Sequence, residues 1–255
     1  MRRLEEQLKP GQNQQYCTIL DEAHAWAGDA KIHACIAESS TSSTKYRQYF
    51  GLMGESNMPW IKPVELVGEQ VILRPLDLTQ VEALVDAVRD GELWKLWYTR
   101  IPAPEQMSAE IQRRLALQQS GSMLPFYIED RSTGQALGMT SFMNIEPLHR
   151  RVEIGSTWYR QSVQHTLVNT ESKQLLLAHA FEQLNCIAVE FRTSSFNVRS
   201  QAAILRLGAK LDGILRSHQV VAGDILRDTY VYSIVKHEWP AVRQNLNWLI
   251  SKPRG

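Results

Sequence analysis

The sequence lacks the features that define several large classes of protein. It has no apolar run long enough to span a bilayer, and its first residues, MRRLEEQLKP, are charged and have no signal-peptide core. Its three cysteines, Cys17, Cys35 and Cys186, have no metal-binding or redox spacing. The formal net charge of +1 gives no broad electrostatic reason to bind nucleic acid. These absences predict a soluble cytoplasmic protein with reduced thiols, no metal, and neither membrane nor nucleic acid as partner.

Regular patterning is also missing from the start of the chain. Residues 1–57 contain the polar run QNQQ, the low-complexity segment ESSTSSTK and one marginal Ala-rich helix candidate at 17–35. From Met58 onward the pattern becomes regular, so we expect a single domain over 58–255. For 1–57 we expect either a poorly ordered extension or a start codon placed too far upstream. A small accessory layer packed on the domain is the structural alternative.

The central stretch of the chain, 151–184, reads as strand, turn and helix. β-branched and aromatic residues alternate with polar ones over 152–159, which is typical of a strand. A polar turn over 160–166 follows, and Asn169 is a good N-cap for a helix with one apolar face. Such a turn leaves backbone N–H groups without partners at the helix start, so it can bind phosphate or pyrophosphate.

A second unit of the same kind follows directly. Residues 186–193 predict a strand, Asn197 begins a short amphipathic helix, and Gly208 ends it. Four stretches in this order resemble the GNAT superfamily of acetyl-CoA-dependent N-acetyltransferases: EIGSTW, QHTLVNTESKQLLLAHAFE, NVRSQAAILRLGA and RDTYVYSI. Within that superfamily the chain is similar to the branch of ribosomal-protein N-terminal (alanine/serine) acetyltransferases. The resemblance covers about 64–249, and four ordered stretches are more specific than any one of them.

The resemblance implies both a fold and an activity. The implied fold is α/β, or α+β: three layers, with a mixed central sheet of about six to seven strands and helices on both faces. The implied function is acetyl-CoA-dependent transfer of an acetyl group to a primary amine, on a protein N-terminus or a small molecule, by direct attack in a ternary complex. Acetyl-CoA is then a co-substrate, and the oligomeric state is left open. The alternative is a non-catalytic acyl-CoA-binding or partner-binding module on the same fold, because a fold alone does not settle function.

Apolar spacing predicts the remaining elements. We expect a strand at 71–75, a helix capped by Thr79, a helix at 106–118, paired strands at 126–129 and 136–145 with a bulge at Gly138, a hairpin of 210–221 with 226–235, and a helix at 238–250. The aromatic segment 93–98 is either a helix or turn beside the acceptor cleft or part of the core.

The resemblance also assigns cofactor-binding residues. The superfamily signature Gln/Arg-x-x-Gly-x-Gly/Ala aligns with 164–169, where Gln164 fits and Leu167 replaces the first small residue. Losing that glycine matters if the backbone there needs a positive φ. An ordinary polar turn is the alternative interpretation. We therefore expect the pyrophosphate and pantetheine to contact Gln164, His165, Thr166, Leu167, Val168, Asn169, Thr170, Asn197 and Ser200. Asn197 and Ser200 could instead serve only the helix start.

Two residues are candidates for catalysis. Glu153, in the strand before the phosphate loop, could accept the proton of the amine; a strand glutamate paired with Arg150 or Arg192 is the alternative. His218 is the second candidate, because histidine is a common general base and this one lies on the predicted hairpin; a simple surface histidine is the alternative. Many superfamily members carry a tyrosine that protonates the leaving thiolate, and Ile204 occupies that position here. The general acid is therefore unassigned. The oxyanion donor would be a backbone N–H within 156–159, where the central strands would splay apart.

Overall fold

The computed structural model describes residues 60–252. The chain divides into two units, Met1–Met58 and Pro59–Gly255. The expectations for 1–57 lie outside the described residues. All that follows concerns the second unit.

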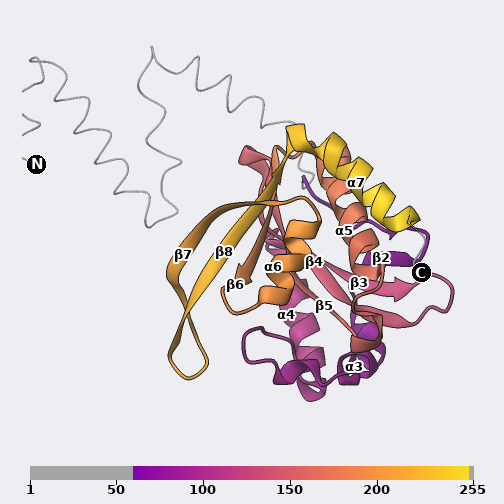
Figure 1. The fold of residues 1–255 in the computed structure, drawn as a ribbon. Helices are drawn as coiled ribbons and strands as arrows, with labels where there is room; N and C mark the ends of the chain where they lie inside the picture. The colour runs from indigo at the N-terminus through magenta and orange to yellow at the C-terminus, as the bar shows by residue number, and fades with distance from the viewer. Residues whose placement is uncertain (1–59, 253–255) are drawn as a thin grey trace, which may run out of the picture. The chain divides into compact units, whose positions relative to one another are not determined.

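The core of this unit is one mixed sheet of eight strands in the order β1-β2-β3-β4-β5-β6-β8-β7 (Figure 1). Only β5 and β6 pair in parallel; every other neighbouring pair is antiparallel. The strands are β1 (Leu66–Val67), β2 (Val71–Pro75), β3 (Met123–Asp130), β4 (Ala136–Glu146), β5 (Arg151–Tyr159), β6 (Ala188–Ser194), β7 (Lys210–Val221) and β8 (Ile225–Val235). The prediction of a mixed sheet is confirmed, and the two-residue β1 brings the number of strands to eight.

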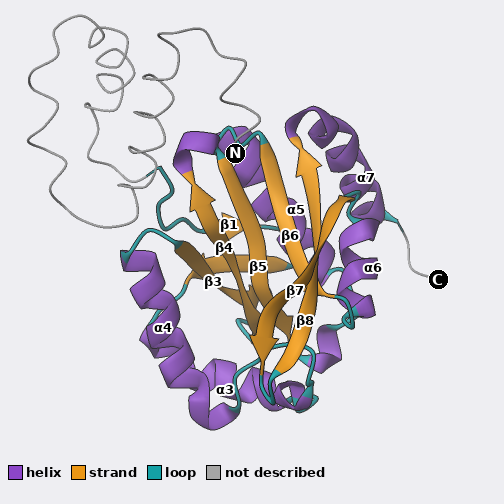
Figure 2. Ribbon diagram, turned by 90° about the vertical axis from the view of Figure 1, so that its left-hand side faces the viewer, coloured by secondary structure: helices purple, strands orange, loops and turns teal. Residues whose placement is uncertain are grey.

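Helices cover both faces of the sheet, as predicted (Figure 2). On one face α5 (Val168–Ala178), α6 (Val198–Arg206) and α7 (Trp239–Ser251) close the larger apolar core, which includes Phe142, Ile154 and Leu176. On the other face α3 (Val81–Arg89) and α4 (Met107–Gln119) pack on Tyr127, Met139 and Trp158. The helix α5 continues through a π-helical turn, His179–Gln183. None of the helices between residues 60 and 252 has the length and apolar character needed to cross a bilayer.

The helix cap expected at Thr79 needs correction. It belongs to Asp77, whose carboxylate accepts the Thr79 N–H at 2.7 Å and begins a short 3₁₀ turn before α3. The aromatic segment 93–98, expected as a helix or turn, contains a 3₁₀ turn, Leu93–Lys95. Within it, Trp97 is 61% exposed and its ring lies 5.2 Å from that of Phe196, so this tryptophan does not fill the core.

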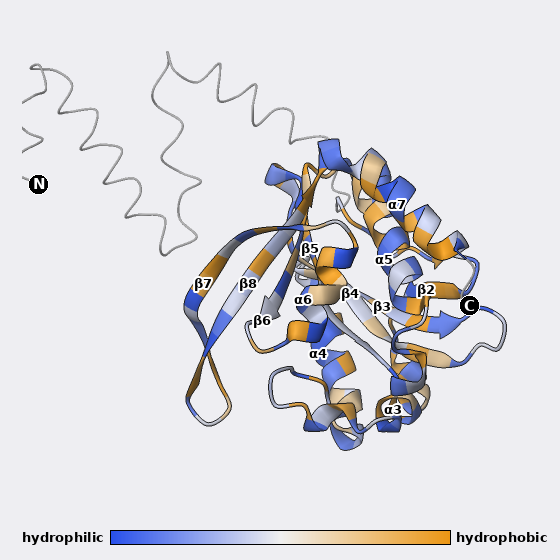
Figure 3. Ribbon diagram, in the orientation of Figure 1, coloured by the Kyte–Doolittle hydropathy of each residue, from blue (hydrophilic) through white to orange (hydrophobic). Residues whose placement is uncertain are grey.

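The sheet opens along one line, between β5 and β6. The two strands pair only over Arg151–Glu153 and Ala188–Glu190, although β5 continues to Tyr159 and β6 to Ser194. Beyond this opening the hairpin of β7 and β8 extends from the body with hydrophobic segments along it (Figure 3). The opening therefore lies between two strands whose outer neighbours, β4 and β8, remain paired to them.

Candidate functional site

The candidate site is built where the pairing of β5 with β6 ends. Glu153 and Glu190 form the last paired positions, and a bulge in β5 follows at once. Gly155 pairs with Ser141 and Trp158 with Met139, so two residues of β5 lie opposite the single Thr140 of β4. A bulge leaves an extra residue unpaired and redirects nearby backbone and side-chain groups. The predicted splay of the strands is therefore present beside a stretch of irregular backbone.

The carboxylate of Glu153 lies at this opening and is only 6% exposed. It accepts a hydrogen bond of 2.7 Å from Asn144 Nδ2, and Arg192 Nε lies 3.5 Å from it. Burial raises the pKa of Glu153, and the attraction of Arg192 and the bond from Asn144 oppose that shift. The ion pair that was the alternative interpretation is thus present with Arg192, and a carboxylate with a raised pKa is also suited to accept a proton.

Gly155 lets the Glu153 side chain lean along its own strand. A Cβ placed on Gly155 would lie 2.8 Å from Glu153 Oε1 and 2.9 Å from Met143 Sδ. Both distances are shorter than a van der Waals contact, so a larger residue would displace the ends of these two side chains. The glycine of the EIG stretch therefore keeps space for the carboxylate beside the bulge.

The expected phosphate loop joins β5 to α5, and its backbone departs from expectation in two places. The positive φ falls on His165, at 64°, whereas Leu167 has an ordinary helical φ of −74°. Replacing glycine by leucine at 167 therefore imposes no backbone strain there. Asn169 is not the N-cap: α5 begins at Val168, and the Thr166 hydroxyl accepts the Val168 N–H at 3.3 Å. The N–H of Asn169, in the first turn, has no acceptor within the helix.

Two charged side chains meet the first turn of α5. Glu171 is 3% exposed, and its carboxylate accepts the N–H groups of Glu69 and Gln70 in the turn between β1 and β2. Its charge is therefore directed into that turn. Arg206, in the last turn of α6, donates to Thr170 Oγ1 at 3.2 Å. An arginine side chain thus lies at the end of α5 where the helix dipole already favours an anion.

The other predicted site residues are spread over two regions. Asn197 caps α6, accepting the Ser200 N–H at 3.1 Å, so its capping role is confirmed and its contact with a ligand stays a prediction. His218 Nδ1 lies 3.1 Å from Thr229 Oγ1 on the hairpin. Thr229 pairs with Ser194, four positions along β6 from the Glu190 that faces Glu153, which is roughly 13 Å at the usual strand rise. The structure does not bring His218 together with Glu153.

Sequence reasoning missed several polar side chains around the bulge and the loop. Asn144 could have been noticed only from the strand register, which places it next to Met143, the partner of Glu153, and Arg206 only from the contact of α6 with α5. Ile204 is buried, with 7% of its surface exposed, so it belongs to the core, as its apolar spacing indicates. No three His, Cys, Asp or Glu side chains within 60–252 are grouped to hold a metal ion.

A family profile, a curated protein and several solved structures are similar to this chain. The profile of the acetyltransferase (GNAT) domain family matches residues 70–210. A Bacillus subtilis (strain 168) protein, YdaF, named as a candidate ribosomal N-acetyltransferase, is 30% identical over 106 residues. That match covers 42% of this chain, and the chain spans 57% of the length of that curated relative.

Solved structures extend the comparison over most of the described fold. A candidate acetyltransferase from T. thermophilus is 31% identical, with a TM-score of 0.66, and the match covers 75% of this chain and 99% of that one. The ribosomal L7/L12 alpha-N-protein acetyltransferase RimL, solved with coenzyme A, is 22% identical with a TM-score of 0.58. That match covers 68% of this chain and 98% of RimL, and it shows a common fold.

Proposed function

Because the chain belongs to the GNAT acetyltransferase family, we propose that it transfers an acetyl group from acetyl-CoA to a primary amine. One observation carries the proposal: the parallel pairing of β5 and β6 ends at a buried glutamate, and a bulge follows in β5. The opening gives a thioester a place between the strands, next to a group that can accept a proton and to redirected backbone N–H groups.

The cofactor end of the site is the loop 164–170 with the start of α5. Main-chain N–H groups at a helix start suit a diphosphate, and Arg206 adds a positive charge beside Thr170. The carboxylate of Glu171 is bonded to the turn between β1 and β2, so it does not occupy the loop. Asn197 and Ser200, at the start of α6, would then face the pantetheine arm across the opening. These residues fit coenzyme A without any glycine at 167.

The chemistry we propose is direct attack by the amine in a ternary complex. An ammonium has no lone pair, so Glu153 accepts its proton, directly or through water, before or during attack on the thioester carbonyl. The oxyanion that develops meets backbone donors at the bulge. When it collapses, the C–S bond breaks, and the second proton lost by the nitrogen goes to the departing thiolate of coenzyme A or to water. Cys186 is not suited to form an acetyl-cysteine intermediate, because its thiol is fully buried and burial raises its pKa to about 12.

The acceptor we propose is the α-amino group of a protein, with a small primary amine as the second choice. The proteins to which this chain is similar include ones named as ribosomal N-acetyltransferases, which supports a ribosomal protein as the acceptor. Such an acceptor and acetyl-CoA meet in the cytoplasm, which is the location we propose.

Two measurements test the function. Calorimetry with coenzyme A tests binding, and a thiol-release assay with acetyl-CoA tests turnover against peptides with free N-termini and against small amines. We expect micromolar-range binding, on the order of −8 kcal/mol, and thiol release that depends on the amine. Mass spectrometry of the peptides locates the added acetyl group. Binding without turnover by any amine would favour the non-catalytic acyl-CoA-binding module, and a chain that binds no coenzyme A would refute both.

A further inference from the structure

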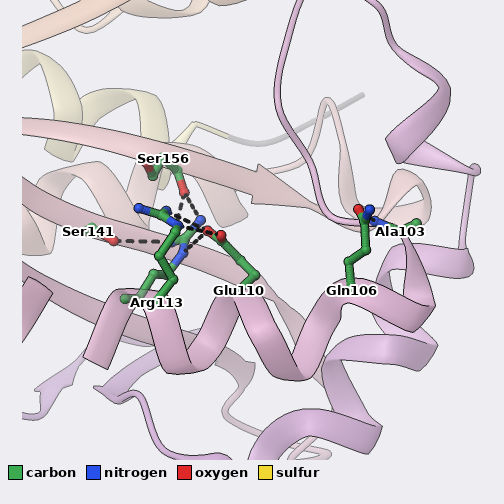
Figure 4. Close-up of polar contacts among 7 residues, drawn as sticks. Ala103, Gln106, Glu110, Arg113, Ser141 and Ser156 are labelled. Atoms are coloured by element: carbon green, nitrogen blue, oxygen red, sulfur yellow. Dashed lines mark hydrogen bonds and ion pairs between the residues drawn. The ribbon is translucent and has the colours of Figure 1, made fainter. Parts of the chain in front are cut away.

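The side chain of Arg114 reaches from α4 to the bulge in β5. Arg114 is 2% exposed, although arginine is rarely buried so completely. Nη1 and Nη2 both donate to the Ser156 carbonyl oxygen at 3.1 Å, and Nη1 also donates to Ser141 Oγ at 3.2 Å. Nε donates to Glu110 Oε1 at 2.7 Å, one turn earlier on the same helix. Figure 4 labels the partners Glu110, Ser141 and Ser156. The guanidinium therefore joins α4 to both strands at the bulge.

The carbonyl that Arg114 binds belongs to a residue in an unfavourable backbone conformation. Ser156 has φ of 48°, in the left-handed region that a residue with a Cβ seldom adopts. Two N–H donors of a charged, planar group on one oxygen hold that carbonyl in a fixed direction. A buried charge is costly unless it is paired, and Glu110 supplies the pairing. The buried Arg114, paired with the partly buried Glu110, therefore holds the conformation of one peptide group.

That peptide group lies at the opening of the sheet. Ser156 comes three residues after Glu153, the last residue of β5 that pairs with β6. In a trans peptide the C=O and the following N–H point in opposite directions. Fixing the Ser156 carbonyl therefore also fixes the N–H of Thr157, and a cation on the carbonyl polarises that amide into a stronger donor.

We infer that Arg114 is a positioning residue for acetyl transfer: it holds the bulge of β5 so that backbone donors there meet the thioester oxygen. The inference rests on the proposed function. Arg114 touches neither substrate in this scheme, since it is 2% exposed and its guanidinium is bonded to Ser156, Ser141 and Glu110. Glu110 orients the guanidinium, and Ser141 receives its remaining bond.

The test compares Arg114→Lys with Arg113→Met. Lysine keeps the charge but has no planar fork to donate twice to one carbonyl. Arg113 is the matched control because it lies next along α4 and its bonds of 2.8 Å to Glu110 stay within that helix. We expect Arg114→Lys to lower kcat about 10- to 100-fold, less than the outright loss of an oxyanion donor. We expect its Kd for coenzyme A to stay within about twofold of the wild-type value, and Arg113→Met to match the wild type in both.

A binding measurement separates positioning from a general structural role. S-ethyl-coenzyme A has no carbonyl oxygen, so the ratio of its Kd to that of acetyl-CoA reports the donors at the bulge. We expect this ratio to fall in Arg114→Lys and to stay unchanged in Arg113→Met. Equal weakening of both ligands, or an unchanged kcat, would overturn the positioning role.

Further comparisons keep the outcome decisive. If Arg114→Lys does not fold, Glu110→Gln carries the test, because it keeps the guanidinium and removes only the charge that orients it. We expect Glu110→Gln to lower kcat by a smaller factor than Arg114→Lys with the Kd for coenzyme A retained, and a loss confined to Kd would overturn the inference. If the wild type itself neither binds coenzyme A nor releases thiol, the proposed function fails. If the wild type is active and these variants equal the control, only the positioning role fails.

Discussion

The ammonium of Lys173 lies 2.7 Å from the hydroxyl oxygen of Thr157, which joins helix α5 to the bulge in β5. Lys173 Nζ also donates to Thr140 Oγ1 at 3.3 Å, and the two threonine hydroxyls lie 2.7 Å apart. The bulge is therefore held from both faces of the sheet, by Arg114 on the α4 side and by Lys173 on the α5 side. Since α5 begins at the candidate phosphate loop, the loop and the candidate oxyanion donors share one rigid connection.

Replacing Lys173 by methionine should change how stability depends on pH. Burial lowers the pKa of Lys173 from 10.5 to about 7, and no carboxylate among the described residues forms an ion pair with it. Below pH 7 both folded and unfolded chains carry the charge, so the cost of burying it is present in full. Between the two pKa values only the unfolded chain is protonated, so wild-type stability rises with pH by up to about 1.4 kcal/mol per unit relative to Lys173→Met.

Urea denaturation from pH 6 to pH 9.5 measures this difference. Lys173→Met should gain most over the wild type at pH 6, and the gain should shrink as pH rises. Lys210→Met is the control, because Lys210 is exposed and paired with Glu238, so its difference from the wild type should stay flat over this range. Parallel curves for the wild type and Lys173→Met would mean that the lysine is charged at neutral pH.

Features that depend on neighbouring residues could be predicted from the sequence, whereas contacts between residues far apart in the sequence could not. The strand around Glu153, the cap at Asn197 and the helix end at Gly208 follow from neighbouring residues, and the structure confirms them. The cap expected at Asn169 was wrong because a hydroxyl one residue before the N-cap, on Thr166, takes the first N–H. That competition between two good capping residues is not visible in spacing alone.

The contacts that shape the bulge lie beyond any local pattern. Arg114 and Ser156 are 42 positions apart, and the bond forms only because α4 packs on β3 and the Arg114 side chain extends from there to β4 and β5. On a helical wheel Arg114 lies on the stripe of Met107 and Ile111, and Lys173 lies on that of Leu176 and Leu177. The wheel does not show which groups these two charged side chains meet. The splay was expected from the family resemblance and not from the residue pattern, because the alternation over 152–159 is the same whether or not a neighbouring strand pairs with it. Family resemblance could place the loop, but it could not supply these side-chain contacts.

Replacing Glu153 by glutamine should remove one limb of the pH–rate profile. Burial raises the pKa of Glu153 above its ordinary value of 4.5. As pH falls through the raised pKa the base is protonated, so wild-type kcat/KM should fall on the acid side. Glu153→Gln should lose that limb and about 10²- to 10⁴-fold of the rate. Stopped-time thiol release from pH 5 to pH 9 checks both.

Glu190→Gln is the matched control for that experiment. Glu190 faces Glu153 across the last pair of the sheet, and its charge contributes to raising the pKa of Glu153. Removing this charge should leave turnover intact and move the acid limb to lower pH. If Glu153→Gln keeps the wild-type profile, the base is another group, and the ion pair with Arg192 is the whole role of Glu153.

Adding one methyl group at Gly155 should impair turnover with little effect on folding. The new Cβ would press on Glu153 Oε1 and Met143 Sδ, which are the ends of flexible side chains and can move aside. We expect Gly155→Ala to lower kcat at least about tenfold, because a displaced base loses its alignment with the amine. Its Tm should stay close to that of Gly213→Ala, a strand glycine whose added Cβ would contact nothing within 4 Å. Full activity in Gly155→Ala would show that the carboxylate position is not critical.

Removing the charge of Arg206 should weaken cofactor binding without slowing the chemical step. Its guanidinium bonds Thr170 Oγ1 in the first turn of α5, where a diphosphate would also meet the unpaired N–H groups. We expect Arg206→Met to raise the Kd for coenzyme A about three- to tenfold, since Arg206 is exposed and water screens its charge. Rising salt should weaken binding to the wild type more than to the variant, because the variant has lost one charge contact with the phosphates.

Arg243→Met is the control: Arg243 lies on α7 and pairs with Glu182 at 3.1 Å, so its loss should leave Kd unchanged. If Arg206→Met binds coenzyme A like the wild type at low salt, the diphosphate is held by main-chain groups alone, and the salt dependence of the two proteins should then coincide.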